Sequence, residues 1–352
     1  MYSKSKRSLL WAQSIFLLFH ISCGMIQPDS LQLEEPHSLK LGDKIKGVAL
    51  ESPAREGNAS LFQELKSLGT NSVCLMPYAF ALRDSMEVTF DSRYQWWGER
   101  TEGILRMIED ARASGLEIML KPHIWLGHGG FTGELRINDS EKQEVWNDSY
   151  RAYILHYARI AEEMDVELFC IGTELCYQVN DEPDYWLSLI EDVRSVYSGP
   201  LTYASNWDCF AGFPHWDALD LIGIDAYFPL EGDYAPDHSN PVISWAHWKD
   251  EMRSVHQETG KDILFTEFGY RSTSFCMEEP WEMSRKGEEN PDNQRRALEL
   301  LFQEVWDEPW MEGGYLWKWH YPDHLRTVSP TSYTVQGKTA IHSVSEAYSP
   351  KK

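Results

Sequence analysis

Residues 262–272 read DILFTEFGYRS, a run of apolar and β-branched side chains with Glu267 near its end. The run is continuous instead of alternating between apolar and polar residues, which is typical of a parallel strand covered on both faces. A carboxylate buried at the end of such a strand is costly unless hydrogen bonds or opposite charges compensate it. We therefore expect Glu267 to have partners and a task.

The chain contains eight runs of this kind, separated by longer amphipathic segments that predict helices. The runs are IKGVALE (45–51), TNSVCLMPY (70–78), EIMLKPHIW (117–125), VELFCIGTE (166–174), PLTYASN (200–206), LDLIGIDAYF (219–228), DILFTEFGY (262–270) and GGYLWKWH (313–320). Eight strands with crossover helices predict an α/β fold, a single (β/α)8 TIM barrel, over residues 44–348. A doubly wound open sheet is the alternative, but ESPAREGN after the first run lacks its glycine-rich turn.

Residues 1–23 have the layout of an export signal, in which basic residues precede an apolar run at 9–19. The run is too short for a comfortable membrane span. The segment resembles a bacterial lipoprotein signal, in which Cys23 is lipidated, although His20 stands where an aliphatic residue is usual. We expect an exported cell-envelope lipoprotein, facing the periplasm or exterior, with residues 24–43 as a tether. A plain secretory signal or an uncleaved anchor is the alternative.

The net charge limits the classes of partner. It is −23, from 32 basic and 55 acidic residues, so binding to a nucleic-acid backbone is disfavoured. A neutral ligand fits better, and an acidic surface also serves solubility alone. The 15 tryptophans indicate stacking on sugar rings or a tryptophan-rich core. We expect a monomer that meets membranes only through its lipid anchor.

Five cysteines remain after Cys23. Cys74 and Cys170 lie inside apolar runs and are expected to be buried thiols. Cys176 and Cys209 are candidates for a disulfide in an oxidising compartment, which the sequence alone leaves open. No C-x-x-C pair occurs, so a structural zinc site is disfavoured.

Polar and aromatic residues close most of the eight runs. In a barrel of this type the active site forms at the carboxyl ends of the strands, so these residues are expected to converge there. Where two of them are separated by one residue, they share a face of the strand, which should point into the barrel mouth. The residues are Lys121, His123, Glu174, Asn206, Asp225, Tyr227, Glu267, Trp317 and Trp319.

Glu174 and Glu267 form a carboxylate pair suited to glycoside hydrolysis. One carboxyl group must protonate the leaving oxygen while the other, ionised, attacks the anomeric carbon, and a separation of ~5 to 5.5 Å predicts retention of configuration. Two neighbouring carboxylates raise each other's proton affinity, which keeps one of them an acid near neutral pH.

Six words of the sequence resemble glycoside hydrolase family 113 of clan A, whose described members are β-1,4-mannanases and β-mannosidases. They are LKPH (120–123), IGTEL (171–175), LTYASN (201–206), LIGIDAYFPL (221–230), FTEFGYRS (265–272) and YLWKW (315–319). The resemblance runs in order from about residue 46 to residue 340. It implies a retaining glycosidase that acts on β-linked mannan or manno-oligosaccharides, without a metal or organic cofactor.

The same resemblance implies catalytic roles by position. Glu174 in IGTEL would be the general acid/base, and Glu267 in FTEFGY would be the nucleophile that forms the glycosyl-enzyme. Tyr227 in IDAYF would donate a hydrogen bond to Glu267.

Substrate contacts are expected from further residues. Many clan A enzymes have Asn directly before the acid/base, where it binds the sugar 2-hydroxyl, but this chain has Thr173, as in family 113. The contact is then expected from Asn206 or His123. Trp317 and Trp319 would form the floor beneath the sugar in the reactive subsite, or else be barrel core.

Lys121 and His123 would bind substrate, form a structural set with Asp225, or do both. Four further tryptophans fall in loops on the same side of the barrel and are candidates for stacking on sugars further out. They are Trp96, Trp97, Trp125 and Trp207.

Plainer readings of the two glutamates remain open. Glu174 could cap or pair with the following helix, and Glu267 could pair with Arg271 as a salt bridge at the rim. The polar constellation around both residues favours the catalytic reading.

Two other hydrolase classes fit less well. A metal-dependent barrel hydrolase would draw ligands from His123, His128 and Asp225, but such sites usually have His-x-His on the first strand, which this chain lacks. A serine esterase is disfavoured because no G-x-S-x-G occurs.

Two alternatives lie closer to the preferred reading. One is another clan A β-glycosidase that acts on gluco- or galacto-configured chains, since specificity for mannose rests on the resemblance alone. The other is a carbohydrate-binding lipoprotein without turnover, which the presence of both glutamates disfavours.

Overall fold

The computed structural model describes residues 44–82, 84–127, 129–231 and 244–349. The export signal, Cys23, the tether and His128 lie outside these ranges, so the predictions that concern them stay predictions. Within the described ranges, none of the helices combines the length and the apolar character needed to cross a membrane.

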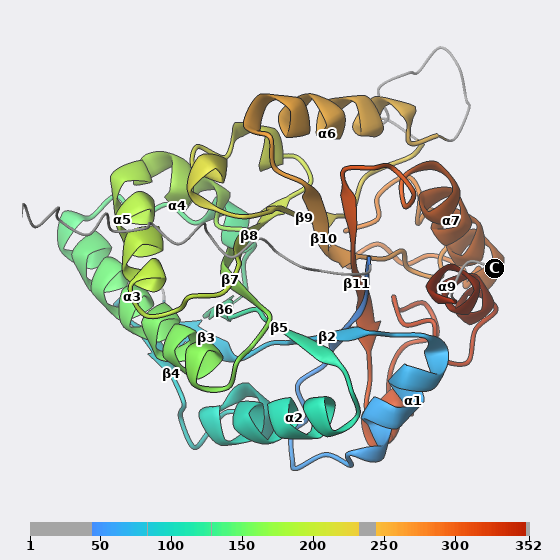
Figure 1. The fold of residues 1–352 in the computed structure, drawn as a ribbon, viewed down its shortest axis with the longest axis horizontal. Helices are drawn as coiled ribbons and strands as arrows, with labels where there is room; N and C mark the ends of the chain where they lie inside the picture. Colours follow the sequence, from blue (N-terminus) through green and yellow to red (C-terminus); the bar gives the residue numbers. More distant parts are fainter. Residues whose placement is uncertain (1–43, 83, 128, 232–243, 350–352) are drawn as a thin grey trace, which may run out of the picture. The chain divides into compact units, whose positions relative to one another are not determined.

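Eight parallel strands close into a barrel, which confirms the predicted (β/α)8 fold (Figure 1). Around the barrel the strand order is β1-β11-β10-β9-β8-β7-β5-β2. The strands are β1 (Ile45–Leu50), β2 (Ser72–Leu75), β5 (Glu117–Leu120), β7 (Leu168–Thr173), β8 (Leu201–Asn206), β9 (Ile222–Ala226), β10 (Ile263–Phe268) and β11 (Met311–Trp319). Each strand derives from one of the eight continuous apolar runs.

Amphipathic helices surround the barrel (Figure 1). In α2, for example, the buried residues Ile104, Met107, Ile108 and Ala111 follow the spacing of one helical face. The longer helices are α1 (Ser60–Leu68), α2 (Thr101–Ala113), α3 (Ser140–Glu163), α5 (Pro183–Arg194), α6 (Ala246–Thr259), α7 (Pro291–Glu304) and α9 (Ala340–Tyr348). Short helices and 3-10 turns lie in the loops: α4 (Cys176–Asp181), α8 (Pro322–Leu325), η1 (Trp97–Glu99), η2 (Thr132–Glu134), η3 (Phe210–Gly212) and η4 (Trp216–Ala218).

Two of the predicted strands are shorter than expected because proline interrupts them. Proline has no backbone N–H to donate to a neighbouring strand. Pro77 follows β2 and Pro122 follows β5. After each proline, the polypeptide continues into a strand of a separate small sheet with the order β4-β3-β6. Its strands are β3 (Tyr78–Ala81), β4 (Val88–Phe90) and β6 (His123–Leu126).

The barrel interior is packed with side chains and is not a pore. Cys74 and Cys170 belong to this inner cluster and are fully buried free thiols, as expected. Tyr315 fills the space next to Gly47, where a Cβ atom would lie 2.3 Å from the tyrosine ring. The Tyr315 hydroxyl forms a hydrogen bond of 3.0 Å with Ser72, so the polar atom of this buried ring is satisfied.

A disulfide joins Cys176, at the start of α4, to Cys209 in the loop after β8, with 6.3 Å between the Cα atoms. The sequence had left this pairing open. The bond links the segment that follows Glu174 to the segment that follows Asn206, so it ties together two loops at the barrel mouth.

Replacing both Cys176 and Cys209 by serine is expected to lower the free energy of unfolding by about 3 to 4 kcal/mol, because the bond closes a loop with a sequence separation of 33 residues. Urea denaturation of the oxidised protein and of the variant measures the difference. Reductant should destabilise the natural protein and leave the variant unchanged. Equal unfolding midpoints for the oxidised protein and the variant would show that the bond adds no stability.

Candidate active site

A buried lysine at the barrel mouth binds two carboxylates. Lys121 directly follows β5, and its side chain is fully buried. Its Nζ atom donates to Asp225 Oδ1 at 2.9 Å and to Glu267 Oε1 at 2.6 Å. Burial alone would lower the pKa of Lys121, but the charges of Asp225 and Glu267 raise it above its usual value. One cation thus serves two carboxylates.

Asp225, on β9, anchors this lysine. It lies beside Glu267 in the register of β9 and β10, and Thr266 donates to its Oδ1 atom at 2.8 Å. Burial and the neighbouring charge of Glu267 raise the pKa of Asp225 to about 7, although Lys121 acts in the opposite direction. Of the predicted set of Lys121 and His123 with Asp225, the ion pair between Lys121 and Asp225 is therefore present, whereas His123 lies next to Glu267 instead.

Glu267, on β10, is the best-supported carboxylate of the site. Besides Lys121, the Tyr227 hydroxyl donates to it, at 2.6 Å from Oε2, which is the hydrogen bond that the family resemblance implies. Burial and the charge of Glu267 raise the pKa of Tyr227 well above its usual range, so this tyrosine remains a donor. Arg271 instead donates to the carbonyls of Thr331 and Glu282, so it forms no rim salt bridge with Glu267. A cation and a hydroxyl group thus hold the two oxygen atoms of Glu267 in place.

Glu174 directly follows β7 and has a different environment. Its φ of 52° is left-handed, a strained conformation for a residue with a Cβ atom, and its N–H donates to the Ala204 carbonyl at 2.8 Å. Burial, followed by the charges of Asp225 and Glu267, raises the pKa of Glu174 well above its usual value. The site therefore favours a protonated Glu174, the state that a general acid in acetal cleavage requires, next to a second carboxylate that is held by two donors.

His123 and Trp317 form one wall beside Glu267. The His123 Nε2 atom lies 3.7 Å from Glu267 Oε1 and has no hydrogen-bond partner among the described residues. Burial and the charge of Lys121 lower the pKa of His123 well below its usual value, so the imidazole is neutral. Its ring is parallel to that of Trp317, with 6.1 Å between the centroids. His123 thus has hydrogen-bonding capacity left for a ligand.

Asn206, at the end of β8, lies beside Asp225 in the strand register and is buried. Its amide nitrogen donates to Asp208 Oδ1 at 2.7 Å, so the following loop holds its side chain. Thr173, before Glu174, donates to the Pro122 carbonyl at 3.4 Å. The predicted polar residues of β5, β8, β9 and β10 are therefore brought together at one end of the barrel.

The expectation that Trp317 and Trp319 share one face is wrong. The β1 pairing passes from Trp317 to Trp319 between consecutive β1 residues, so an irregularity at Lys318 breaks the alternation of β11. Trp317 is partly exposed at the site, whereas Trp319 is only 2% exposed and belongs to the large core around the barrel. Trp319 therefore cannot form part of a sugar floor.

The four outer tryptophans also separate into two groups. Trp96 and Trp125 are exposed, at 44% and 53%, and both line a cavity at the barrel mouth. Trp207 is buried and stacks on Trp281, and Trp97 packs partly buried against the core. Only the first two are available to a ligand.

Three further residues at the barrel mouth were not predicted from the sequence as site residues. Tyr78 lies 5.1 Å from the His123 ring, and its position at the end of an apolar run was a usable signal. Lys318 lies 5.1 Å from the Trp317 ring and belongs to the YLWKW word. Tyr333 packs edge-on against Tyr227 at 5.6 Å, from a loop with no periodic pattern that could have drawn attention to it.

The chain matches Glycoside Hydrolase Family 113 over residues 52–338. A solved β-mannanase of that family from Alicyclobacillus acidocaldarius, in complex with ManMIm, is 27% identical; the alignment covers 88% of this chain and 98% of that one, with a TM-score of 0.75. A β-1,4-mannanase of the same family is 24% identical over 87% and 99% of the two chains, with a TM-score of 0.75, which shows the shared fold. A β-glucuronidase from Faecalibacterium prausnitzii has 15% identity and a TM-score of 0.56 over 87% of this chain and 48% of its own.

No curated protein matches the chain in sequence. The family match nevertheless spans most of the chain. It begins at residue 52, just after β1, and ends at residue 338, just before α9. The chain is thus a glycosidase whose family implies a β-linked carbohydrate substrate, and it belongs to glycoside hydrolase family 113.

Proposed function

We propose that this glycosidase cleaves β-1,4-mannosidic linkages in mannan or manno-oligosaccharides and retains the anomeric configuration. The observation that carries the mechanism is the unequal environment of the two glutamates. Lys121 and Tyr227 donate to Glu267, whereas burial and neighbouring carboxylates raise the pKa of Glu174. Two unequal carboxyl groups at one barrel mouth suit a double displacement.

In the first step, a Glu267 oxygen forms a bond to the anomeric carbon while the bond from that carbon to the leaving oxygen breaks. Glu174 gives its proton to the leaving oxygen. In the second step, Glu174 accepts a proton from water, the water oxygen bonds to the anomeric carbon, and the bond to Glu267 breaks. Lys121 and Tyr227 orient Glu267 for the first step. In the second step they stabilise, through their hydrogen bonds, the carboxylate that forms again when the bond to the sugar breaks.

The choice of mannan rests on the family and on one related enzyme. The Alicyclobacillus acidocaldarius protein, named as a β-mannanase, is 27% identical to this chain over nearly its whole length. Within the site, His123 Nε2, which has no hydrogen-bond partner in the part of the chain that the structure describes, can bind a hydroxyl group of the sugar under attack. Trp317 is placed to contact the ring of that sugar.

Purified protein without residues 1–23 is expected to hydrolyse mannohexaose and to release the β-anomer first, as NMR of the fresh products would show. Initial release of the α-anomer would exclude the retaining mechanism. Turnover of β-glucan or β-galactan oligomers, with none of mannohexaose, would instead identify a glycosidase of another specificity.

We also propose that the protein is exported and anchored in the cell envelope through Cys23. The pattern of residues 1–23 supports this proposal. The Cys176–Cys209 disulfide supports it independently, since such bonds persist in oxidising compartments.

A further inference from the structure

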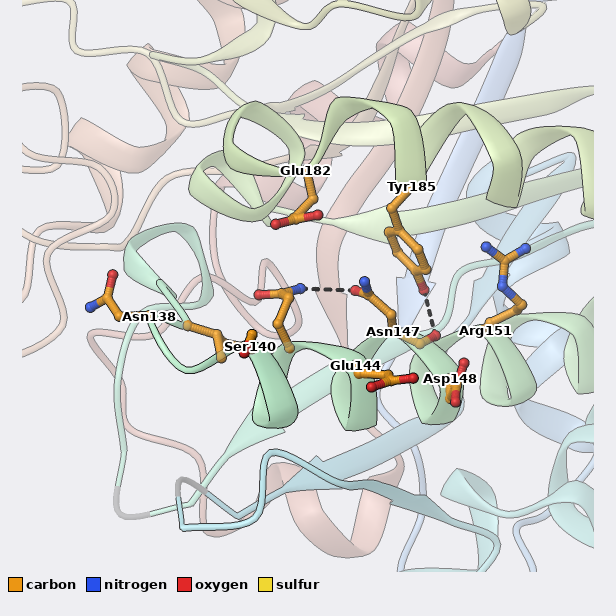
Figure 2. A pocket seen from close by; sticks show the side chains of 10 residues that line it. Asn138, Ser140, Glu144, Asn147, Asp148, Arg151, Glu182 and Tyr185 are labelled. Carbon is orange, nitrogen blue, oxygen red and sulfur yellow. Dashed lines mark hydrogen bonds between the residues drawn. The ribbon is translucent and has the colours of Figure 1, made fainter.

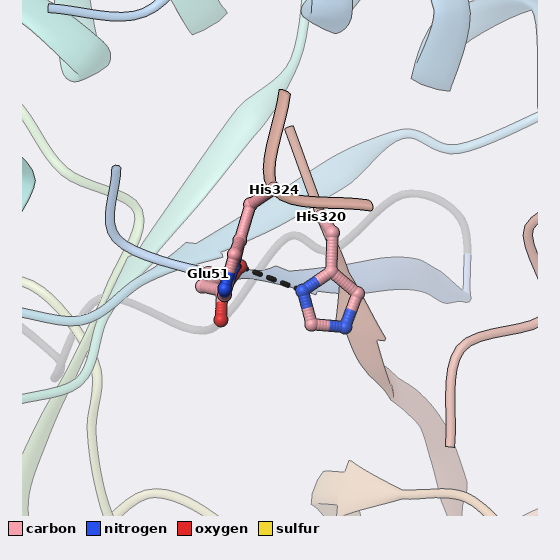
Figure 3. Close-up of side chains that lie close together, drawn as sticks. All are labelled: Glu51, His320 and His324. Atoms are coloured by element: carbon pink, nitrogen blue, oxygen red, sulfur yellow. Dashed lines mark hydrogen bonds and ion pairs between the residues drawn. The ribbon is translucent and has the colours of Figure 1, made fainter. Parts of the chain in front are cut away.

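A glutamate and two histidines meet where the barrel closes. Glu51 directly follows β1, the first strand of the barrel, and His320 directly follows β11, the last one. His324 lies in the short helix α8 that comes next. Figure 3 shows that the three side chains lie close together, although Glu51 and His320 are 269 residues apart in the sequence. The cluster therefore connects the first strand of the barrel with the last.

The nitrogen and oxygen atoms of these side chains surround one point. Glu51 Oε2 lies 2.6 Å from His320 Nδ1 and is also in contact with His324 Nδ1. One such atom from each residue lies within 4.8 Å of the other two. The two imidazole rings are inclined at 73°, with 5.7 Å between their centroids, so they approach the carboxylate from different directions and do not stack on each other.

The backbone holds two of the three residues in place. β1 pairs with β11 in parallel, and the Glu51 N–H donates to the Trp319 carbonyl at 2.9 Å, which fixes Glu51 next to His320. The Gln336 side chain accepts from the His320 N–H at 2.8 Å and donates to the His320 carbonyl at 3.0 Å. The His320 side chain is buried. The cluster is thus supported by rigid strand ends, which is what a precise ligand site needs.

Two imidazole nitrogens and one carboxylate oxygen are a known ligand set for Zn²⁺. Ca²⁺ and Mg²⁺ prefer oxygen ligands, so the two histidines disfavour them. In a tetrahedral site with bonds of ~2.0 to 2.1 Å, the ligand atoms are about 3.3 Å apart, so small side-chain rotations suffice to admit the ion. No cysteine takes part, so the lack of a C-x-x-C pair does not argue against such a site.

Among the described residues, the group of His, Cys, Asp and Glu side chains that converges in this way consists of Glu51, His320 and His324. Lys318 lies next to it, with Nζ at 3.5 Å from Glu51 Oε1, the oxygen that the histidines do not contact. Glu51 can then bind an ion through Oε2 alone, and a partner on the other oxygen is usual for such a carboxylate. The Glu51 charge reduces the repulsion between the ammonium group and a bound cation.

One side of the cluster is open to solvent. Glu51 and His324 line a cavity of about 600 Å³, and Glu51 also lines an adjoining cavity of about 440 Å³ together with Trp125. The two cavities share Glu51, Ser52 and Trp96, and together they form a groove. The His324 side chain is 44% exposed. An ion with three protein ligands at this place has a fourth position that water can reach.

We propose that Glu51, His320 and His324 bind one Zn²⁺ ion through Oε2 and the two Nδ1 atoms, with water as the fourth ligand. The ion joins β1 to β11 and α8, so it stabilises the closure of the barrel between its first and last strands. Its role is structural, and the reaction proposed for Glu174 and Glu267 does not use it. The proposal is independent of the proposed function, because it depends on no property of the substrate.

Zinc titration of the purified protein tests the site. After treatment with a chelator and dialysis, calorimetry with Zn²⁺ should show one high-affinity site per chain. Glu51→Gln, His320→Ala and His324→Ala should each weaken this binding by about 100-fold or more, since even the loss of an outer partner of a metal ligand costs about 10- to 100-fold. X-ray absorption of the zinc-loaded protein should show nitrogen and oxygen ligands at ~2.0 to 2.1 Å, with scattering from imidazole rings.

The melting temperature gives a second measurement. An ion that binds only the folded protein should raise the melting temperature by about 5 °C when its free concentration is 100 times Kd. His324→Ala, which changes a partly exposed side chain and should fold, is expected to lose this shift. His324→Glu, which supplies a carboxylate ligand, should restore part of it. If His324 only donated a hydrogen bond to Glu51, a second carboxylate at that position would restore nothing.

Two matched controls separate the cluster from the rest of the acidic surface. His247→Ala on α6 removes an exposed histidine whose Nε2 atom lies 4.0 Å from Glu251. Glu144→Gln removes a carboxylate from a polar cavity of about 520 Å³ between α3 and α5, which Asp148 and Glu182 also line (Figure 2). Both variants should bind Zn²⁺ as tightly as the natural protein.

The proposal is overturned if the protein binds no Zn²⁺, or if Zn²⁺ binds the three ligand variants as tightly as the natural protein, which would mean adventitious binding to other groups. It is also overturned if Zn²⁺ leaves the melting temperature of the natural protein unchanged. These outcomes are distinct from a failure of the proposed function: a protein that does not cleave mannohexaose is still expected to bind Zn²⁺ at Glu51.

Discussion

Glu267→Ala is expected to lower kcat for mannohexaose by about 10⁴- to 10⁶-fold, because it removes the atom that attacks the anomeric carbon. The fold should persist, since Lys121 keeps its ion pair with Asp225. Steady-state rates together with circular dichroism spectra check both parts. Glu144→Ala, in the cavity between α3 and α5, is the matched control and should retain full activity.

Azide distinguishes the roles of the two glutamates. In Glu267→Ala, azide occupies the space of the missing carboxylate, so an aryl β-mannoside should yield α-mannosyl azide. In Glu174→Ala, azide attacks the glycosyl-enzyme from the opposite face, so the product should be β-mannosyl azide. NMR identifies both products. The reverse assignment of products, or substantial activity in Glu267→Ala, would refute the proposed roles.

Lys121→Met is expected to be the most destabilising single substitution at the site, with a loss of ~3 to 5 kcal/mol, because it leaves two buried carboxylates without their cation. The loss should depend on pH. Asp225 already has a folded-state pKa of about 7, raised above its ordinary 3.8, so its charged form destabilises the fold as the pH rises through that range. Without Lys121 the effect grows, so the deficit should be smallest near pH 4 and largest above pH 7.

Urea denaturation at pH 4, 6 and 8 measures this deficit. Lys142→Met on α3 is the matched control and should show almost no change at any pH. The double variant Lys121→Met with Asp225→Asn should recover part of the lost stability, since one of the two unpaired charges is gone. A deficit that is the same at pH 4 and pH 8 would mean that packing, and not charge, accounts for the effect of Lys121.

The sequence was sufficient to predict the barrel because each of its strands is buried on both faces. Such strands carry uninterrupted apolar runs, and the closing residues of those runs include Lys121, Asp225 and Glu267, which the structure joins in one network. This part of the site could be predicted because the carboxyl ends of parallel strands must meet at one end of a barrel.

Other features could not be read from the runs, for identifiable reasons. Pro77 and Pro122 can be recognised in the sequence as residues that interrupt a strand. Only the structure shows that the segments after them form a separate sheet. The irregularity at Lys318 reverses the side-chain alternation of β11 and has no marker in the sequence, so Trp319 was misplaced. The groove unites Glu51, Trp96 and Trp125 from separate loops and strands, and no local pattern announces a convergence of that kind.

The shared lysine also has an evolutionary consequence. Because one ammonium group balances both Asp225 and Glu267, these positions cannot vary independently. A descendant that lost Lys121 alone would carry uncompensated charge in its interior, and one that lost Asp225 alone would change the setting of its nucleophile. Substitutions of Lys121 and of its two carboxylate partners should therefore occur together during evolution. Homologues that keep both acidic residues should also keep a cation at position 121.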